Sequence, residues 1–291
     1  MVLWPFRHGT GLIWLCLYLW TIMPVTGEEA ERPSTTYDNV GVHEALHVEY
    51  LEMAPWYDEF WKAYLDKTLL KPLDLVHDLV QRQQEEQQTD NAPPVVVDVA
   101  CGTGVFLKRY IHQYHTNDET VEPLRQQHIP KLIGIEPSGA MLEQAHRKFT
   151  PDDEALVDFY QGAAESLPLD NASVDILCST NAFHFFRDKN VALQEMKRVL
   201  RPGGSLVITD WCNDFLPVKL YHNLVERLRW IRFPHRYPGP LGSRQMLESV
   251  QQAGFTEVSI EKYPIRFWVV CFWGMHTITA SKSADDTTCQ A

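Results

Sequence analysis

The chain has 291 residues, 45% of them hydrophobic, which is enough for one sizeable α/β domain with additional segments. Its formal net charge of -12 repels phosphate backbones, so the composition argues against nucleic acid as a partner. The six cysteines are widely spaced and form no CxxC pair, so they indicate buried thiols and neither a disulfide framework nor a zinc site. No metal is expected, because no cluster of ligand residues has metal spacing.

The N-terminal segment, residues 1–27, is predicted to be a signal peptide or an uncleaved signal anchor. Residues 11–25 are apolar and uncharged, Arg7 precedes them and acidic residues follow. Residues 28–36 are polar and are predicted to form a linker. We expect membrane association through residues 11–25, or entry into the secretory pathway or an organelle, on a side of the membrane that the sequence leaves open.

Residues 37–90 are predicted to be helical. Apolar residues recur at spacings of three and four between Trp56 and Leu65, and again between Leu69 and Val80. This periodicity is typical of amphipathic helices that pack one face on a core.

The stretch from Val95 to Leu107 joins a strand to a helix through a turn. β-branched residues favour a buried parallel strand, and Gly102 and Gly104 allow backbone N–H groups to approach a ligand closely. The following helix directs its positive dipole end at this turn, so the turn can hold a nucleotide-like ligand. Leu107 stands where a dinucleotide fingerprint needs a third glycine, and Asp98 would repel a pyrophosphate, so a nicotinamide dinucleotide is disfavoured.

Strands and helices alternate along the rest of the chain. Further strands are predicted at 131–136, 157–161, 173–179, 205–210, 257–263 and 267–280, and further helices after Ser138, at 189–200 and at 243–253. This order predicts an α/β fold with a doubly wound, Rossmann-like, mostly parallel sheet of seven strands. Helices cover both faces, and the last two strands form an antiparallel hairpin at the sheet edge.

Five segments carry motifs in a shared order: residues 97–104 (VDVACGTG), 134–138, 162–170, 173–175 and 195–204. Together they resemble the class I S-adenosylmethionine-dependent methyltransferases with a methyltransferase type 11-like domain. The resemblance spans roughly residues 37–280. It implies one domain over residues 37–282, with a helical lid at 37–90, a catalytic core at 91–282 and a flexible tail at 283–291.

The resemblance implies how the chain would hold S-adenosylmethionine. Gly102 and Gly104 would pass under the methionine part, and Asp98 would help to hold its amino group. Glu136, at the end of the second strand, would accept hydrogen bonds from both ribose hydroxyls, since a carboxylate offers two oxygens.

Four more residues receive implied cofactor-binding roles. Ala164 and Glu165 would border the adenine, Asn181 would lie beneath the sulfonium, and Tyr57 would close over the cofactor as a lid residue. Many relatives have Asp where Ala163 stands, so a side-chain acceptor for the adenine amine is missing.

His184 is the best-placed candidate for a general base, because it follows the fourth strand close to the expected transfer site. The alternative is a packed core histidine between two phenylalanines. In-line methyl transfer needs a base only when the nucleophile must lose a proton, since most of the acceleration comes from positioning.

The predicted function is direct methyl transfer from S-adenosylmethionine to a small or lipophilic, lipid-like acceptor. Aromatic and apolar residues between Trp211 and Tyr237 suggest such an acceptor, although they would equally serve to cover the sheet. A non-catalytic binding protein with the same fold is the alternative, and a nicotinamide-dependent oxidoreductase is a weaker one. The sequence leaves the acceptor atom and the oligomeric state open.

Overall fold

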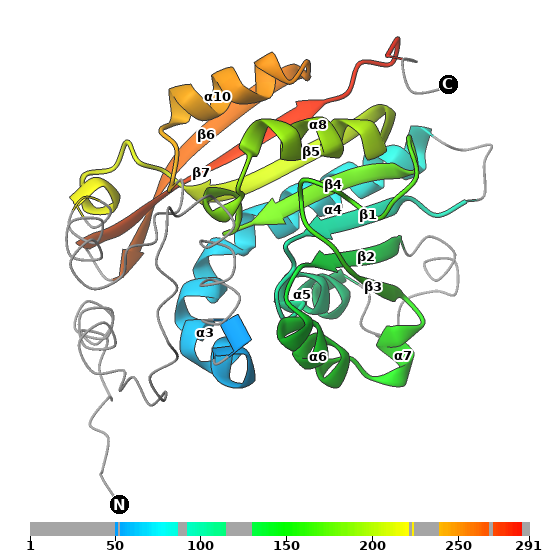
Figure 1. The fold of residues 1–291 in the computed structure, drawn as a ribbon, viewed down its shortest axis with the longest axis horizontal. Coiled ribbons are helices and arrows are strands. Elements are labelled where there is room, and N and C mark those ends of the chain that lie inside the picture. Colours follow the sequence, from blue (N-terminus) through cyan, green and yellow to red (C-terminus); the bar gives the residue numbers. More distant parts are fainter. Residues whose placement is uncertain are drawn as a thin grey trace, which may run out of the picture.

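The computed structural model describes residues 50–51, 53–86, 92–114, 130–220, 223, 239–267 and 270–286. They form one seven-stranded sheet in the order β3-β2-β1-β4-β5-β7-β6 (Figure 1). The strands are β1 (Val95–Val99), β2 (Lys131–Glu136), β3 (Val157–Gln161), β4 (Val174–Thr180), β5 (Leu200–Trp211), β6 (Thr256–Phe267) and β7 (Val270–Ser281).

The first five strands are parallel, and β7 runs antiparallel to both β5 and β6. The predicted doubly wound sheet and the C-terminal hairpin are therefore confirmed. Within the hairpin, β6 forms the edge and β7, the later strand, lies inside the sheet.

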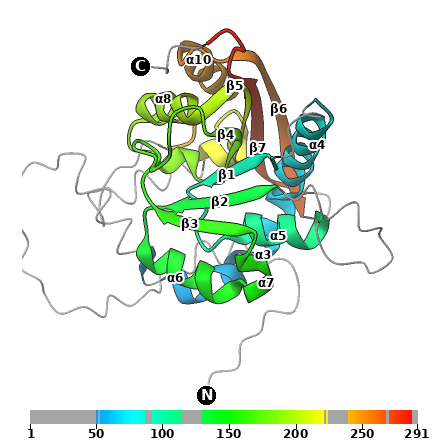
Figure 2. The same ribbon diagram turned by 90° about the vertical axis from the view of Figure 1, so that its right-hand side faces the viewer.

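Helices cover both faces of this sheet. They are α3 (Tyr57–Thr68), α4 (Leu70–Glu86), α5 (Val105–Tyr114), α6 (Gly139–Lys148), α7 (Pro151–Glu154), α8 (Lys189–Val199) and α10 (Ser243–Gln252), with 3-10 turns at Ala54–Trp56 and Phe183–Phe185. Figure 2 shows α4 and α5 on one side of the sheet and α8 and α10 on the other.

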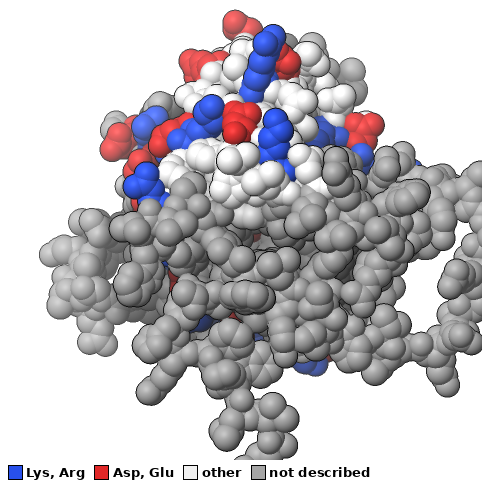
Figure 3. Space-filling view, turned by 90° about the vertical axis from the view of Figure 1, so that its left-hand side faces the viewer, with Lys and Arg blue, Asp and Glu red and all other residues white. Residues whose placement is uncertain are grey.

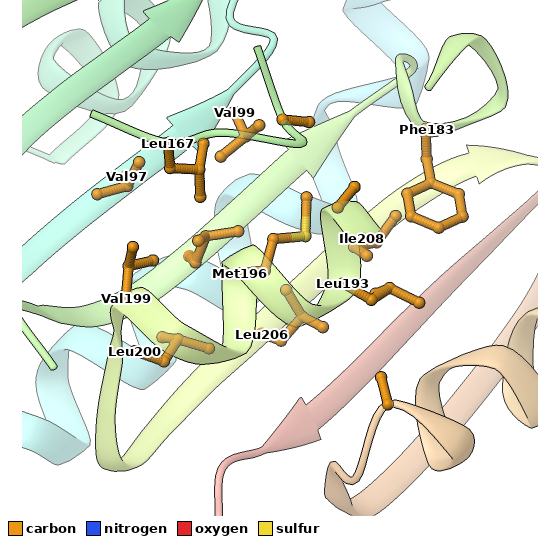
Figure 4. Packing of buried hydrophobic residues seen from close by; sticks show 14 of the residues in the cluster. Val97, Val99, Leu167, Phe183, Leu193, Met196, Val199, Leu200, Leu206 and Ile208 are labelled. Carbon is orange, nitrogen blue, oxygen red and sulfur yellow. The ribbon is translucent and has the colours of Figure 1, made fainter. Parts of the chain in front are cut away.

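Alternation along β1 divides the core into two layers, since successive side chains of a strand point to opposite faces. Val97 and Val99 pack in the layer that contains Leu193 and Met196 of α8 (Figure 4). Val96 points the other way, into the layer that contains residues of α4 and α5. Asp98 shares the face of Val96, so its carboxylate lies under α4 and α5, away from α8.

Residues 201–204, between the predicted helix at 189–200 and the predicted strand at 205–210, form a turn that belongs to a longer β5. Gly203 N–H donates to the Lys282 carbonyl, and Lys282 N–H donates to the Gly204 carbonyl, both at 2.9 Å. These bonds extend the strand through the glycine pair, because the C-terminal segment pairs with the turn itself.

Several predictions lie outside the described residues, namely the segment 1–27, the linker 28–36 and most of the aromatic region after residue 220. In the described ranges, none of the helices has the length and apolar character needed to cross a bilayer. On one face of the described part, acidic and basic side chains alternate with one another (Figure 3).

Candidate functional site

A cavity of about 420 Å³ lies at the carboxyl ends of β1, β2 and β4. The strand order reverses between β1 and β4, and ligands of open α/β sheets bind at such a point. Its walls come from the segments that follow these strands, from residues 163–165, and from the N-terminal helical region.

The glycine turn after β1 forms one wall. Gly102 and Gly104 have φ values of +56° and +73°, in the left-handed region that glycine adopts at little cost. Gly102 faces the cavity, where a Cβ atom would meet nothing within 4 Å. Gly104 lies behind the turn, where a Cβ atom would lie 3.0 Å from the Phe149 ring, so only Gly102 borders the ligand space directly.

Glu136 ends β2 and lines the cavity with its carboxylate held in place. Oε2 accepts the Gly102 N–H at 2.9 Å, and Oε1 accepts the Ser138 N–H at 3.0 Å. Burial raises the pKa of Glu136 to about 6, although both backbone donors lower it. The side chain therefore presents a fixed carboxylate beside the glycine turn.

Asp98 lies behind this wall, since it is 1% exposed and is not among the described residues that line the cavity. The Cys178 thiol donates to Oδ1 at 3.9 Å, and buried Oδ2 has no partner among the described residues. Burial, followed by the charge of Glu136, raises the pKa of Asp98 well above its usual value. Its cofactor-binding role remains a prediction.

The lid helix α3 closes the cavity from the other side. Tyr57 lines the cavity, and burial followed by the charges of Glu136 and Asp58 keeps its pKa well above the usual value, so the phenol stays neutral. Next to it, Asp58 accepts a 2.5 Å hydrogen bond from the Thr103 hydroxyl and pairs with Lys148 of α6. The lid is thus fastened directly to the glycine turn.

Asn181 follows β4 and also lines the cavity, with a left-handed backbone at φ +58°. Its side chain faces the lid helix: Oδ1 accepts the Tyr64 hydroxyl at 2.8 Å, and Nδ2 donates to the Thr68 hydroxyl at 3.1 Å. Trp211 Nε1 donates to the same Tyr64 hydroxyl at 2.6 Å. The amide therefore joins the lid to the sheet, in addition to bordering the cavity.

Ala164 and Glu165 line the cavity, and their place beside the adenine remains a prediction. Glu165 Oε1 accepts the N–H of Asp188 at 3.1 Å, so this carboxylate ties the loop to the start of α8. The sequence predictions thus converge, since Tyr57, Gly102, Glu136, Ala164, Glu165 and Asn181 all border one cavity.

His184 is placed differently. Its side chain is 1% exposed, its Nδ1 lies 2.6 Å from Asp210 Oδ1, and its ring stacks on Trp211 with centroids 4.4 Å apart. It is absent from the described cavity lining, because the 3-10 turn at Phe183–Phe185 directs it into the core. Its role as a general base stays a prediction, and this placement favours the alternative of a hydrogen-bonded core residue.

Sequence reasoning missed several lining residues, among them Tyr50, Phe185, Phe186 and Arg187. The signal that could have found three of them is position, because residues 185–187 come shortly after the carboxyl end of β4, at Thr180. The Tyr50 ring packs edge-on against Phe185, with centroids 6.1 Å apart. In the part of the chain that the structure describes, no group of three or more His, Cys, Asp or Glu could hold a metal ion.

The fold has been seen in solved proteins. An S-adenosylmethionine-dependent methyltransferase of Thermotoga maritima superposes with a TM-score of 0.55 at 19% identity, over 79% of this chain and 98% of that one. The seven-stranded sheet with its cavity at the switch point is therefore a methyltransferase fold.

Sequence comparison identifies the domain. Residues 97–208 match the model of the methyltransferase domain. The ubiquinone/menaquinone biosynthesis C-methyltransferase UbiE of Campylobacter jejuni is 26% identical over 58% of this chain and 73% of its own length. The demethylmenaquinone methyltransferase of Lactococcus lactis is 24% identical over 64% of this chain and 75% of its own. Residues 97–208 therefore carry a methyltransferase domain, and these relatives support the class I S-adenosylmethionine-dependent methyltransferases as its family and S-adenosylmethionine as its cofactor.

Proposed function

We propose that this methyltransferase acts on a small, lipophilic acceptor bound in the apolar part of the cavity. The observation that supports this most directly is the composition of the cavity wall. Apolar and aromatic side chains lie there beside the residues that are predicted to bind the cofactor: Tyr50, Leu65, Leu69 and Phe185. Apolar linings of this kind favour ligands with an apolar body. The relatives named for ubiquinone and menaquinone biosynthesis are consistent with this class of acceptor.

The cavity residues fit the cofactor. Open space in front of Gly102 leaves room for a ligand against the turn, and the Glu136 carboxylate is fixed beside it. We propose that Glu136 binds the ribose, that Gly102 and Gly104 shape the methionine site and that Asp98 supports that site from behind. Ala164 and Glu165 would flank the adenine, with Asn181 and Tyr57 enclosing the reacting end. When bound, S-adenosylmethionine supplies an electrophilic methyl group.

The described residues contribute enclosure and positioning. Tyr57 and the lid helix cover the cavity, and the Asp58 contact with Thr103 holds the lid against the glycine turn. Excluding water and restricting the motion of two bound reactants supply most of the acceleration in a displacement of this kind.

Cofactor binding to the full-length chain tests the site. Calorimetry with S-adenosylmethionine should give one site, and Glu136→Gln should weaken it about tenfold or more, because a charged acceptor is replaced by a neutral amide. Glu85→Gln, on the exposed part of α4, is the matched control and should bind like the wild type. Equal affinity for Glu136→Gln would contradict the assignment of this carboxylate.

Methyl transfer from labelled S-adenosylmethionine tests the acceptor class. Incubation with a total cell extract should place the label in the lipid-soluble small-molecule fraction. Label only in protein or RNA would refute the lipophilic acceptor. Cofactor binding without transfer to any fraction would support a non-catalytic binding protein, and preferential binding of a nicotinamide dinucleotide would revive the oxidoreductase reading.

Membrane association through residues 11–25 remains a separate proposal, supported by their sequence alone. Flotation of the full-length chain with liposomes, compared with a chain that starts at Glu28, measures it directly. The limits of the domain at residues 37 and 282 are likewise predictions.

A further inference from the structure

The described part of the cavity wall carries more acidic than basic side chains. Among the described lining residues, Glu136 and Glu165 are acidic and Arg187 is the one basic residue. Both glutamates accept backbone N–H groups, from Gly102 and Ser138 in the first case and from Asp188 in the second. Their carboxylates are therefore already hydrogen-bonded within the protein.

Arg187 stands at the end of the apolar part of the wall. It follows Phe185 and Phe186 directly, and all three line the cavity. The Phe185 N–H donates to the Ala182 carbonyl, and the Phe186 N–H donates to the Phe183 carbonyl. These bonds of the 3-10 turn set the direction in which the backbone continues to Arg187. The residue is exposed, and its charge therefore lies at the rim, between the apolar lining and water.

Neighbouring groups hold the backbone around Arg187. Asp188 Oδ1 accepts the N–H groups of Asn190 and Val191, at 3.0 and 3.1 Å, and caps α8. Lys189 Nζ donates to the carbonyls of His184 and Phe186, at 3.3 and 3.4 Å. The segment is thus anchored on both sides of the arginine.

Arg187 itself forms no ion pair with any residue in the described ranges. A guanidinium carries five N–H donors in a planar fork that matches the two oxygens of a carboxylate or phosphate. The formal net charge of -12 would otherwise disfavour an anion near this protein, so a local cation at the cavity rim is needed to attract one.

We propose that Arg187 is a specificity-determining residue that selects an acceptor with an apolar body and an anionic end group, a carboxylate or a phosphate. The apolar body lies along Phe185 and Leu69, and the anionic group binds the guanidinium at the rim. This inference rests on the proposed function, because it names the class of molecule that fills the acceptor part of the same cavity.

Three probes with the same alkyl chain test the inference: dodecanoate and dodecyl phosphate, each below its micelle concentration, and dodecanol below its solubility limit. Their affinities are measured by calorimetry on the full-length protein, with and without saturating S-adenosylhomocysteine. We expect at least one anion to bind about tenfold more tightly than the alcohol. The ranking of dodecanoate and dodecyl phosphate then identifies the end group.

Variants at position 187 test whether the charge of the side chain, and not a change in the fold, causes the preference for anions. Arg187→Gln should abolish the preference for anions and leave dodecanol unchanged, whereas Arg187→Lys should retain part of it. Arg82→Gln, at an exposed position on α4, is the control and should keep the full preference.

Three outcomes would overturn the inference: equal binding of alcohol and anions by the wild type, an unchanged preference in Arg187→Gln, or an equal loss for all three probes in that variant. Failure of S-adenosylhomocysteine to bind would instead contradict the proposed function. The preference for anions remains measurable without that ligand, so the two failures are distinguishable.

Discussion

The Tyr64 hydroxyl donates a 2.8 Å hydrogen bond to Oδ1 of Asn181, which lies 117 positions further along the chain. The same hydroxyl accepts the indole N–H of Trp211 at 2.6 Å. One phenol thus joins the lid helix to the ends of two central strands. Because Asn181 has a left-handed backbone at the cavity wall, this contact helps to hold a conformation that non-glycine residues seldom adopt.

Replacing this phenol should therefore lower stability. Tyr64→Phe removes the hydroxyl that forms hydrogen bonds with both Asn181 and Trp211, and Tyr64 is buried. The expected loss is about 2 kcal/mol in the free energy of unfolding. Urea denaturation measures the loss. Tyr160→Phe, on an exposed tyrosine, should change stability by less than about 0.5 kcal/mol. Similar values for both variants would show that the Tyr64 contacts contribute little.

The two glycines of the turn should respond differently to alanine. Gly104→Ala adds a methyl group 3.0 Å from the Phe149 ring at φ +73°, so we expect a loss of stability above the roughly 1 kcal/mol of left-handed strain alone. Gly102→Ala carries the same left-handed strain at φ +56° but adds its methyl group to open space in the cavity, so it should lose less stability than Gly104→Ala and weaken cofactor binding more. Thermal denaturation measures the loss of stability in both variants, and calorimetry measures their affinity for the cofactor. Equal effects of the two changes on binding would contradict this expectation.

Glu136 gives a pH dependence of stability with a defined sign. Its pKa is raised from 4.5 to about 6 in the folded protein, so the folded state binds more protons than the unfolded state between these values. Its contribution is fully present below pH 4.5 and is lost as the pH rises through about 6, an effect of about 2 kcal/mol.

Glu136→Gln cannot titrate and should lack this component. Denaturation of the wild type and the variant at intervals from pH 4 to pH 7 measures the difference between their slopes. Asp98 contributes a change of the same sign in both proteins, because burial raises its pKa in each, and that change is smaller in the variant, which lacks the charge of Glu136. Parallel curves for the two proteins would refute the assignment to Glu136.

The contact of Asp58 with Thr103 should control how firmly the lid is held. Asp58→Asn weakens the hydrogen bond to the turn and removes the ion pair with Lys148, so amide exchange in α3 should become about fivefold faster. Global stability should fall by no more than about 1 kcal/mol, because the Asp58 side chain is 44% exposed. Glu59→Gln, an exposed neighbour on the same helix, is the control. Unchanged amide exchange in Asp58→Asn would show that this contact does not hold the lid.

Local chemistry made the sheet and the glycine turn predictable. Runs of β-branched residues define β1, and Gly102 and Gly104 are needed at positive φ, so both follow from residue type. Ser138 was predictable as a helix cap for the same reason, and its hydroxyl accepts the Met141 N–H.

Features that depend on direction in space were harder to predict. Its position after β4 predicts that His184 lies close to the transfer site, but the 3-10 turn points its ring into the core. The same turn leaves Arg187 at the cavity rim. The pairing of Tyr64 with Asn181 has no sequence pattern either, because it depends on how the lid packs across the strand ends.

The interior position of β7 has a consequence for protein synthesis. The strand pairs with both β5 and β6, yet it follows both of them in the chain, and its Ile278 is fully buried. While residues 270–281 are still in the ribosome, the backbone of β5 has no antiparallel neighbour, and an unpaired edge is a template for association with other chains. The nascent chain is therefore most prone to aggregate just before its last strand emerges, and insertion of that strand completes the sheet.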